Sequence, residues 1–290
     1  MIIQHNMTAY NTNRQLGITN GNLAKSSEKL SSGYRINRAG DDAAGLSISE
    51  KMRGQIRGLE QASTNAQDGI SLIQTAEGAL NEIHAILQRQ RELTVQAAND
   101  TNVDEDRAAI DKEMAQLNNE IDRIAQSTEF NTMKLLNGEG GPNDGNVFTF
   151  QVGANTNGDA EEQMISVTID SMTVDSLGLT SFEIDTNATE PALLTDFATA
   201  NAYISTIDTA MVQVSSLRSN LGSVQNRLEH TIANADNTAE NLQAAESRIR
   251  DVDMAEEMVK YSKDSILQQA AQSMLAQANQ SSQGVLSLLQ

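Results

Sequence analysis

The chain has 290 residues and a formal net charge of −19, with 3% aromatic residues and no tryptophan. Because large aromatic side chains dominate compact cores, this composition argues against an ordinary globular fold. The acidic balance argues against nucleic acid as a general partner. The absence of cysteine excludes disulfides, thiolate metal sites and a cysteine nucleophile.

The amino terminus, MIIQHNMTAYNTNRQ, lacks the charged start and apolar middle of a cleavable signal peptide. If the protein is exported, another route must therefore carry it. No apolar run approaches the roughly 20 residues that span a bilayer, so we expect no membrane insertion.

Residues 1–40 are basic and carry one thin apolar stripe. The only acid among them is Glu28, whereas the basic residues are Arg14, Lys25, Lys29, Arg35 and Arg38. The stripe recurs every seven residues, at Ala9, Leu16, Leu23 and Leu30. This spacing predicts a helix that buries too little area to fold alone. Leu16, Leu23 and Leu30 are therefore candidate self-assembly residues.

The stretch GYRINRAGDDAAGLSISEKM, residues 33–52, places glycines around the adjacent carboxylates Asp41 and Asp42. It has the glycine spacing of a phosphate loop but lacks that loop's lysine. It also lacks the alternating oxygen ligands of a calcium loop. We interpret it as an interruption between two helices, in which the acids favour the start of the second helix.

Apolar residues at spacings of three and four predict long helices over 43–99, 104–129 and 193–250. Asp104 is expected to cap the second of these helices. A helix over 43–99 is about 85 Å long at about 1.5 Å per residue, too long for a compact domain of this size. The sequence therefore predicts a mainly α, elongated antiparallel helical bundle or coiled-coil rod made from the N- and C-terminal arms.

The middle of the chain has a different character. From Leu135 to Leu217 there are twelve acids and no Lys or Arg, so this block must face solvent. The segments NVFTFQVG and MISVTIDSMTV alternate apolar and polar residues, and a turn-rich segment joins them. This pattern predicts a small β-hairpin.

Residues 251–290 are acidic and carry a second apolar stripe. Opposite charges at the two chain ends favour their pairing, although only weakly where the charges are exposed. The candidate self-assembly residues of this stripe are Met258, Ile266, Met274 and Leu275.

Nothing in the sequence builds an active site. His5, His84 and His230 are single and far apart, and no G-x-S-x-G elbow occurs. We therefore expect no catalytic, cofactor-binding or metal-binding residues. In ILQRQRELTVQAAND, helical spacing predicts Arg89, Leu93 and Gln96 on one face. An exposed Arg beside an exposed Leu would suit docking, and the plainer alternative is a solvated helix face.

Both ends of the chain resemble bacterial flagellin. The match includes NTNRQLGITNGNLAKSSEKLSSGYRINRAGDDAAGLSISEKM and QRQRELTVQAAND near the start, and NRLEHTIANADNTAENLQAAESRIRDVDMAEEM near the end. The resemblance implies a non-enzymatic structural subunit that self-polymerises into the flagellar filament for motility. The alternative is a hook–filament junction (hook-associated) protein of the same appendage.

The resemblance also implies a division of the chain. An inner-tube helix plus connector would occupy 1–42, and the N-terminal half of a rod domain 43–140. A short, variable, β-rich outer segment would occupy 141–192. The C-terminal half of the rod domain would follow over 193–250, and a second inner-tube helix over 251–290.

The partners and location are likewise implied by the resemblance. An export chaperone would hold the C-terminal helix, about 252–290, and the flagellar type III apparatus would export the chain without a cleaved signal peptide. The extracellular subunit would then meet other copies, the filament cap and hook-associated proteins. Similar sequences bind Toll-like receptor 5, which implies contacts from Arg89, Leu93, Gln96 and Glu113.

Overall fold

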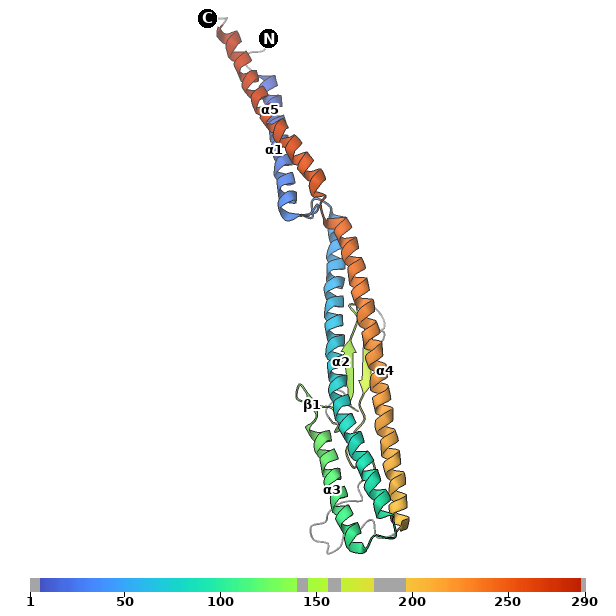
Figure 1. Ribbon diagram of the computed structural model, residues 1–290. Helices are drawn as coiled ribbons and strands as arrows, with labels where there is room; N and C mark the ends of the chain where they lie inside the picture. Colours follow the sequence, from blue (N-terminus) through green and yellow to red (C-terminus); the bar gives the residue numbers. More distant parts are fainter. Residues whose placement is uncertain (1–5, 140–145, 156–162, 180–196, 288–290) are drawn as a thin grey trace. The chain divides into compact units, whose positions relative to one another are not determined.

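The computed structural model describes residues 6–139, 146–155, 163–179 and 197–287 (Figure 1). The chain divides into two compact units. Unit 1 contains Met1–Ile56 and Glu240–Gln290, and unit 2 contains Arg57–Ala239. Both ends of the chain therefore belong to the same unit, and the central part forms the other.

The described residues are mainly helical. The helices are α1 (Met7–Ser32), α2 (Ala43–Ala97), α3 (Asp104–Ser127), α4 (Phe197–Arg250) and α5 (Met254–Ser287). Two short antiparallel strand pairs accompany them: β1 (Glu129–Phe130) with β2 (Met133–Lys134), and β3 (Val147–Gln151) with β4 (Met164–Thr168). The predicted mainly α fold with a small β region is confirmed. The three long helices match their predicted ranges, although residues 193–196 lie outside the described part.

The prediction that Asp104 caps α3 is wrong. The N-cap is Val103, whose backbone remains extended, and Asp104 is already the first helical residue. The Asp106 carboxylate accepts a hydrogen bond from the Val103 N–H at 3.4 Å. Asp104 contributes instead as one of three acids in the first turn, where negative charge is favourable.

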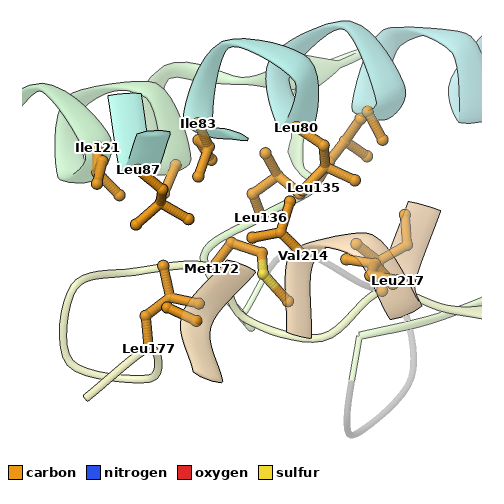
Figure 2. Close-up of a cluster of buried hydrophobic side chains, with 14 of the residues drawn as sticks. Leu80, Ile83, Leu87, Ile121, Leu135, Leu136, Met172, Leu177, Val214 and Leu217 are labelled. Carbon is orange, nitrogen blue, oxygen red and sulfur yellow. The ribbon is translucent and has the colours of Figure 1, made fainter. Parts of the chain in front are cut away.

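Unit 2 is built around an apolar core between α2, α3 and α4. The antiparallel course of α2 and α4 is marked by ion pairs from Arg218 to Glu77 and from Arg91 to Asp208. Figure 2 shows part of the core. Its buried side chains come from α2, α3, α4 and the segments after β2 and β4, and include Leu80, Ile83, Leu87, Ile121, Leu135, Leu136, Met172, Leu177, Val214 and Leu217.

The predicted hairpin is confirmed as β3 and β4, with Phe148 opposite Val167 and Phe150 opposite Ile165. It packs on α2, where the Asn65 side chain donates to the Gln151 carbonyl at 3.0 Å. Gly69 makes this approach possible, because a Cβ there would lie only 3.2 Å from the Phe150 ring.

Asn146 connects the segments that flank the hairpin. Its buried side-chain amide donates to the carbonyls of Leu135 at 2.8 Å and Ile169 at 2.9 Å. The Asn146 backbone has φ 55°, a left-handed conformation that asparagine tolerates better than most residues. The Asn146 side chain therefore joins the segment after β2 to the segment after β4.

Candidate functional site

Helices α1 and α5, the two terminal helices, form an antiparallel pair within unit 1 (Figure 1). Their direction follows from three hydrogen bonds across the pair. Ser26 Oγ donates to Glu257 Oε1 at 2.6 Å, Gln268 Nε2 donates to Asn20 Oδ1 at 2.9 Å, and Asn6 Nδ2 donates to the Ala278 carbonyl at 3.0 Å. Partners early in α1 thus meet partners late in α5.

The seam between these helices is largely polar. Thr19, Ser26 and Glu257 are its buried side chains among the residues described. None of the ion pairs within the described part of the chain joins α1 to α5. The pairing predicted from opposite charges is therefore present, but hydrogen bonds hold it rather than cross-helix ion pairs.

The residues predicted to mediate self-assembly divide into two groups. Leu16, Leu23 and Leu30 are half-buried, because their face of α1 also carries Thr19 and Ser26 and packs on α5. Leu275 is half-buried as well, whereas Met258, Ile266 and Met274 are exposed. The α1 stripe thus contributes to pairing within one chain.

The outer side of the pair carries large apolar side chains in contact with solvent. On α1 they are Met7, Tyr10 and Ile18, and on α5 they are Met254, Met258, Val259, Ile266, Leu267 and Met274. Tyr10 is 72% exposed. Monomeric soluble proteins seldom expose apolar side chains in such groups, so this surface is a candidate interaction site.

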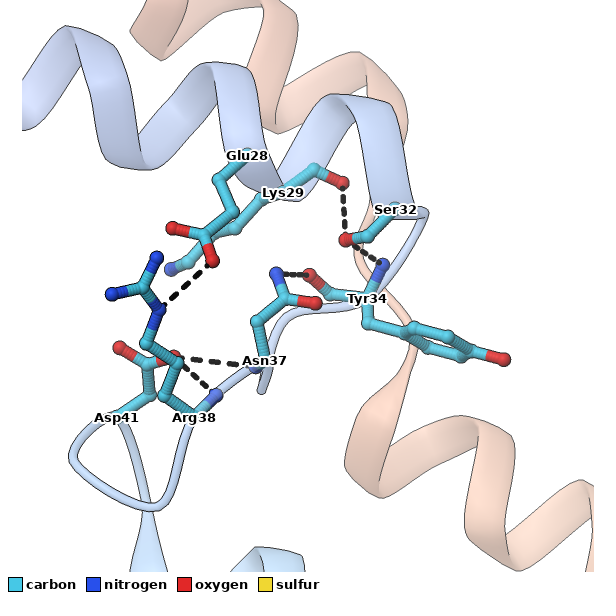
Figure 3. A network of polar contacts seen from close by, with 7 residues as sticks. All are labelled: Glu28, Lys29, Ser32, Tyr34, Asn37, Arg38 and Asp41. Atoms are coloured by element: carbon cyan, nitrogen blue, oxygen red, sulfur yellow. Dashed lines mark hydrogen bonds and ion pairs between the residues drawn. The ribbon is translucent and has the colours of Figure 1, made fainter.

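The glycine-rich stretch connects α1 to α2. Gly33 ends α1 in the left-handed conformation, with φ 76°, and its N–H donates to the Lys29 carbonyl at 2.9 Å. Figure 3 shows the polar contacts that follow. Asn37 Nδ2 donates to the Tyr34 carbonyl at 3.2 Å, and Arg38 Nε donates to Glu28 Oε1 at 3.1 Å.

The two aspartates of this connector have separate roles. Asp41 Oδ2 accepts from the N–H groups of Arg38, at 3.0 Å, and Asn37, at 3.2 Å, and these bonds lower the pKa of Asp41. Asp42 Oδ1 accepts from the Gly45 N–H at 2.9 Å, in the manner of an N-cap for α2. The interpretation of the stretch as a joint between two helices is confirmed.

A second connector, between α4 and α5, lies against the first. Tyr34 and Asp251 form an antiparallel bridge, in which the Arg35 N–H donates to the Arg250 carbonyl at 2.7 Å and the Val252 N–H to the Gly33 carbonyl at 3.0 Å. The Arg250 guanidinium lies 4.8 Å from the centre of the Tyr34 ring. Sequence reasoning missed this pairing because its members are more than two hundred residues apart.

In unit 2, the structure brings Arg89 and Glu113 together. Arg89 Nη2 lies 2.9 Å from Glu113 Oε1, and Arg89 Nη1 lies 3.4 Å from Glu92 Oε2. These contacts, chiefly the bond to Glu113, raise the pKa of Arg89. All three side chains are about half exposed or more, and Gln96 is exposed on the same helix.

The expectation that Leu93 is exposed beside Arg89 is wrong, because its side chain is only 2% exposed. The α2 face that packs in the core includes Leu87, Gln90, Thr94 and Ala97, and Leu93 belongs to it. Next to it, the buried Gln90 amide donates to Asn118 Oδ1 at 2.7 Å. The exposed charges of Arg89 and Glu113 therefore lie over a packed core. Leu93 belongs to that core and lines no groove for an apolar ligand group.

The described residues form neither a metal-ligand cluster nor a membrane-spanning helix. Among them, no three His, Asp or Glu side chains gather closely enough to hold a metal ion. Within the same residues, no helix combines the length and the apolar character that crossing a bilayer requires.

Known proteins resemble this chain over nearly its whole length. Residues 3–140 match the bacterial flagellin N-terminal helical region, and residues 204–289 match the bacterial flagellin C-terminal helical region. A flagellin of Halalkalibacterium halodurans is 56% identical over 100% of both chains. The flagellar filament 33 kDa core protein of Treponema phagedenis is 51% identical, again over 100% of both chains.

Among solved structures, a putative flagellar hook-associated protein from Vibrio parahaemolyticus has a TM-score of 0.57. It is 16% identical, and the match covers 73% of this chain and 100% of that chain. At this identity the likeness concerns the fold alone. The full-length identity to curated flagellins is decisive, and the chain belongs to the bacterial flagellin family.

Proposed function

We propose that this chain is the structural subunit that self-polymerises into the bacterial flagellar filament for motility. The family consists of structural proteins rather than enzymes. The observation that carries the proposal is the apolar outer side of α1 and α5, because side chains such as Tyr10 and Ile266 are exposed and the described residues of unit 1 do not cover them. Burying them against other copies contributes about 25 cal/mol per Å² of apolar surface.

The proposed division of the chain follows the same logic. Residues 1–42 and 251–290 would form the inner tube, and both belong to unit 1. Residues 43–140 and 193–250 would form the rod domain of the next shell. The acidic side chains of the segment 141–192 would face outward, where their charge stays solvated, whereas apolar side chains of the same segment, such as Phe148 and Met172, are buried in the core.

Seeded elongation tests the assembly proposal. We expect the purified chain to remain soluble, and to extend short filament fragments into long filaments that electron microscopy detects. Deletion of residues 256–290 should abolish elongation, since it removes most of the α5 surface. Elongation at an unchanged rate by the deletion variant would contradict the proposal.

Two point variants separate pairing within a chain from association between chains. Leu23→Asp places a charge in the α1–α5 seam, so we expect loss of helical circular dichroism as well as loss of elongation. Ile266→Asp places a charge on the exposed side, so helicity should stay unchanged while elongation fails. Normal filaments from both variants would show that these faces do not assemble.

The alternative function, a hook–filament junction protein, makes a different prediction. Such a protein would add to a filament end and stop, so the seeds would not lengthen. The fold that the chain shares with a putative hook-associated protein is compatible with either function.

The proposed partners are those that the resemblance to flagellins implies, and the exposed apolar side chains of α5 offer the chaperone a surface to cover. An export chaperone would cover this surface, about residues 252–290, before the flagellar type III apparatus exports the chain without a cleaved signal peptide. Outside the cell, the filament cap and hook-associated proteins would meet the same chain ends. Binding of the chaperone should be lost when residues 256–290 are deleted, which co-purification measures.

A second proposal concerns Toll-like receptor 5. The exposed ion pair of Arg89 and Glu113 fixes one donor group and one acceptor group from neighbouring helices, and Gln96 adds an amide on α2. Arginine is enriched among the residues that contribute most to binding at protein interfaces. We propose these three residues as contacts, with the buried Leu93 supporting the surface from below.

Receptor binding of matched variants tests this proposal. Arg89→Ala and Glu113→Ala should each weaken affinity about tenfold, within the range of interface anchors. Arg123→Ala is the control, because it removes another exposed, ion-paired arginine from the same unit. Equal affinity of the Arg89 and Glu113 variants and the unmodified chain would refute the contact assignment.

A further inference from the structure

The methionines of this protein are unevenly distributed over the surface. Within the described residues, the exposed methionines all lie on α1 and α5: they are Met7, Met254, Met258 and Met274, with exposed fractions from 48% to 68%. In unit 2, Met114 and Met172 are buried, and the remaining methionines of that unit are half-buried. The thioethers that a soluble reagent reaches most easily are therefore concentrated on the terminal helices.

These four side chains lie towards the two ends of the α1–α5 pair. Met254 and Met258 are one helical turn apart at the start of α5. At the other end, Met7 follows Asn6, whose amide donates to the Ala278 carbonyl, and Met274 lies one turn before Ala278. All four stay outside the polar seam, so a change at their sulfur atoms leaves the contacts between Ser26 and Glu257 intact.

We propose that these four methionines form an oxidation-sensitive modification site that controls association between copies of the chain. The substrate class is a hydroperoxide, such as hydrogen peroxide. The inference rests on the proposed function, because it requires the exposed side of α1 and α5 to become buried during assembly.

The reaction is a two-electron oxygen transfer. A lone pair of the thioether sulfur attacks one peroxide oxygen, an S–O bond forms and the O–O bond breaks. The second oxygen leaves as water after taking up the proton of the first. The sulfur is oxidised to a sulfoxide while the peroxide is reduced, and methionine sulfoxide reductases reverse the change.

The effect of the sulfoxide depends on where it lies. On the solvated surface of a free chain, water satisfies the new S=O acceptor, so the fold of each unit is unchanged. Between copies, the same group would be buried without a designated donor, which is unfavourable. Oxidation also removes the adaptable apolar packing for which methionine suits interfaces. Free chains should therefore lose the ability to add to a filament.

Peroxide treatment of the full, unassembled chain tests the inference. Peptide mass spectrometry should find sulfoxide at Met7, Met254, Met258 and Met274 before Met114 or Met172. Elongation from seeds should slow at least about tenfold, as expected when polar groups replace thioethers in an interface. Subsequent treatment with both stereospecific methionine sulfoxide reductases should restore the rate.

A variant with all four exposed methionines replaced by leucine identifies the residues responsible. Compared with its own untreated elongation rate, this variant should lose less than about twofold after peroxide, because its side chains at these positions contain no oxidisable sulfur. Should leucine prevent assembly, the reductase rescue of the unmodified chain still decides the question.

Two results would overturn the inference: an unchanged elongation rate of the fully oxidised chain, or slow elongation that the reductases do not restore. Failure of the untreated chain to elongate would instead count against the filament proposal itself. The two failures are therefore distinguishable in one experiment.

Discussion

The two compact units bury different kinds of side chain. In unit 2, large apolar side chains such as Leu80 and Ile83 are completely inaccessible to solvent. In unit 1, Ile36 is the single buried apolar side chain among the residues described, and it is outnumbered by the buried polar residues Thr19, Ser26, Ser49 and Glu257. One unit has a hydrophobic core, whereas the other pairs its terminal helices through a few buried polar side chains and half-buried leucines.

The difference shows where the stability of the chain resides. Ordering a residue costs roughly 1–2 kcal/mol of backbone entropy, which buried apolar area must offset. Unit 2 has such area along three helices, whereas the α1–α5 pair leaves much of its apolar surface in water. Unit 1 should therefore open more easily than unit 2, and it gains most from additional copies.

The largest expected effect comes from the unit 2 core. Leu80→Ala should lower the free energy of unfolding of unit 2 by about 2–5 kcal/mol, as is typical for a fully buried leucine. Leu16→Ala, in the half-buried seam of unit 1, should cost about 1 kcal/mol or less. Urea unfolding monitored by hydrogen exchange measures the free energy of unfolding of each unit. Equal losses of stability in the two variants would contradict the comparison.

The next largest effect is expected for Asn146→Ala. It should lower the free energy of unfolding of unit 2 by about 2–3 kcal/mol, because it leaves two buried carbonyls without their donor. Asn131→Ala is the matched control. It shares the left-handed backbone, with φ 47°, but its side chain is exposed. Urea denaturation should show the smaller loss for this control, and similar losses would assign the effect to the backbone alone.

Ser26→Ala should weaken the α1–α5 pair by about 1–2 kcal/mol, since the buried Glu257 carboxylate loses its 2.6 Å donor. The neighbouring exposed Ser27 provides the control, because Ser27→Ala removes no contact across the pair. Hydrogen exchange of α1 amides measures the opening. Unchanged protection in the Ser26 variant would mean that this bond does not hold the seam.

The smallest expected effect is on the stability of the α1–α2 connector at low pH. Backbone hydrogen bonds from Arg38 and Asn37 lower the pKa of Asp41 below its ordinary value of 3.8. A lowered folded-state pKa means that the stabilisation is present above the ordinary value and is lost as the pH falls through the folded-state pKa. NMR titration should find the titration midpoint of Asp41 below 3.8. Asp41→Asn should remove this pH dependence from the stability of the connector.

The helices and the main hairpin could be predicted because their periods are local. Spacings of three and four residues follow from any helix that packs on one side, and alternation follows from a strand with one covered face. The connector was predictable for a similar reason, since glycines and aspartates favour helix ends. These features need no knowledge of distant partners.

The errors concern partners that the sequence pattern does not identify. The period of α2 alone does not reveal which side α3 will cover, and so Leu93 was assigned to the surface. The seven-residue stripe of α1 indicates an adhesive face but not whether α5 or another copy covers it. The β1–β2 turn was missed because Asn131 and Thr132 adopt positive φ without a glycine to signal it.

Tension applied to either terminal helix reaches the bridge between Tyr34 and Asp251. At this bridge both connectors, between α1 and α2 and between α4 and α5, would resist the tension. The hydrogen bonds from Arg35 to Arg250 and from Val252 to Gly33 tie them together. A single connector would take up twisting by rotating about a few free dihedral angles. With the two connectors tied in this way, a rotation at Gly33 would have to break these bonds or move the second connector as well.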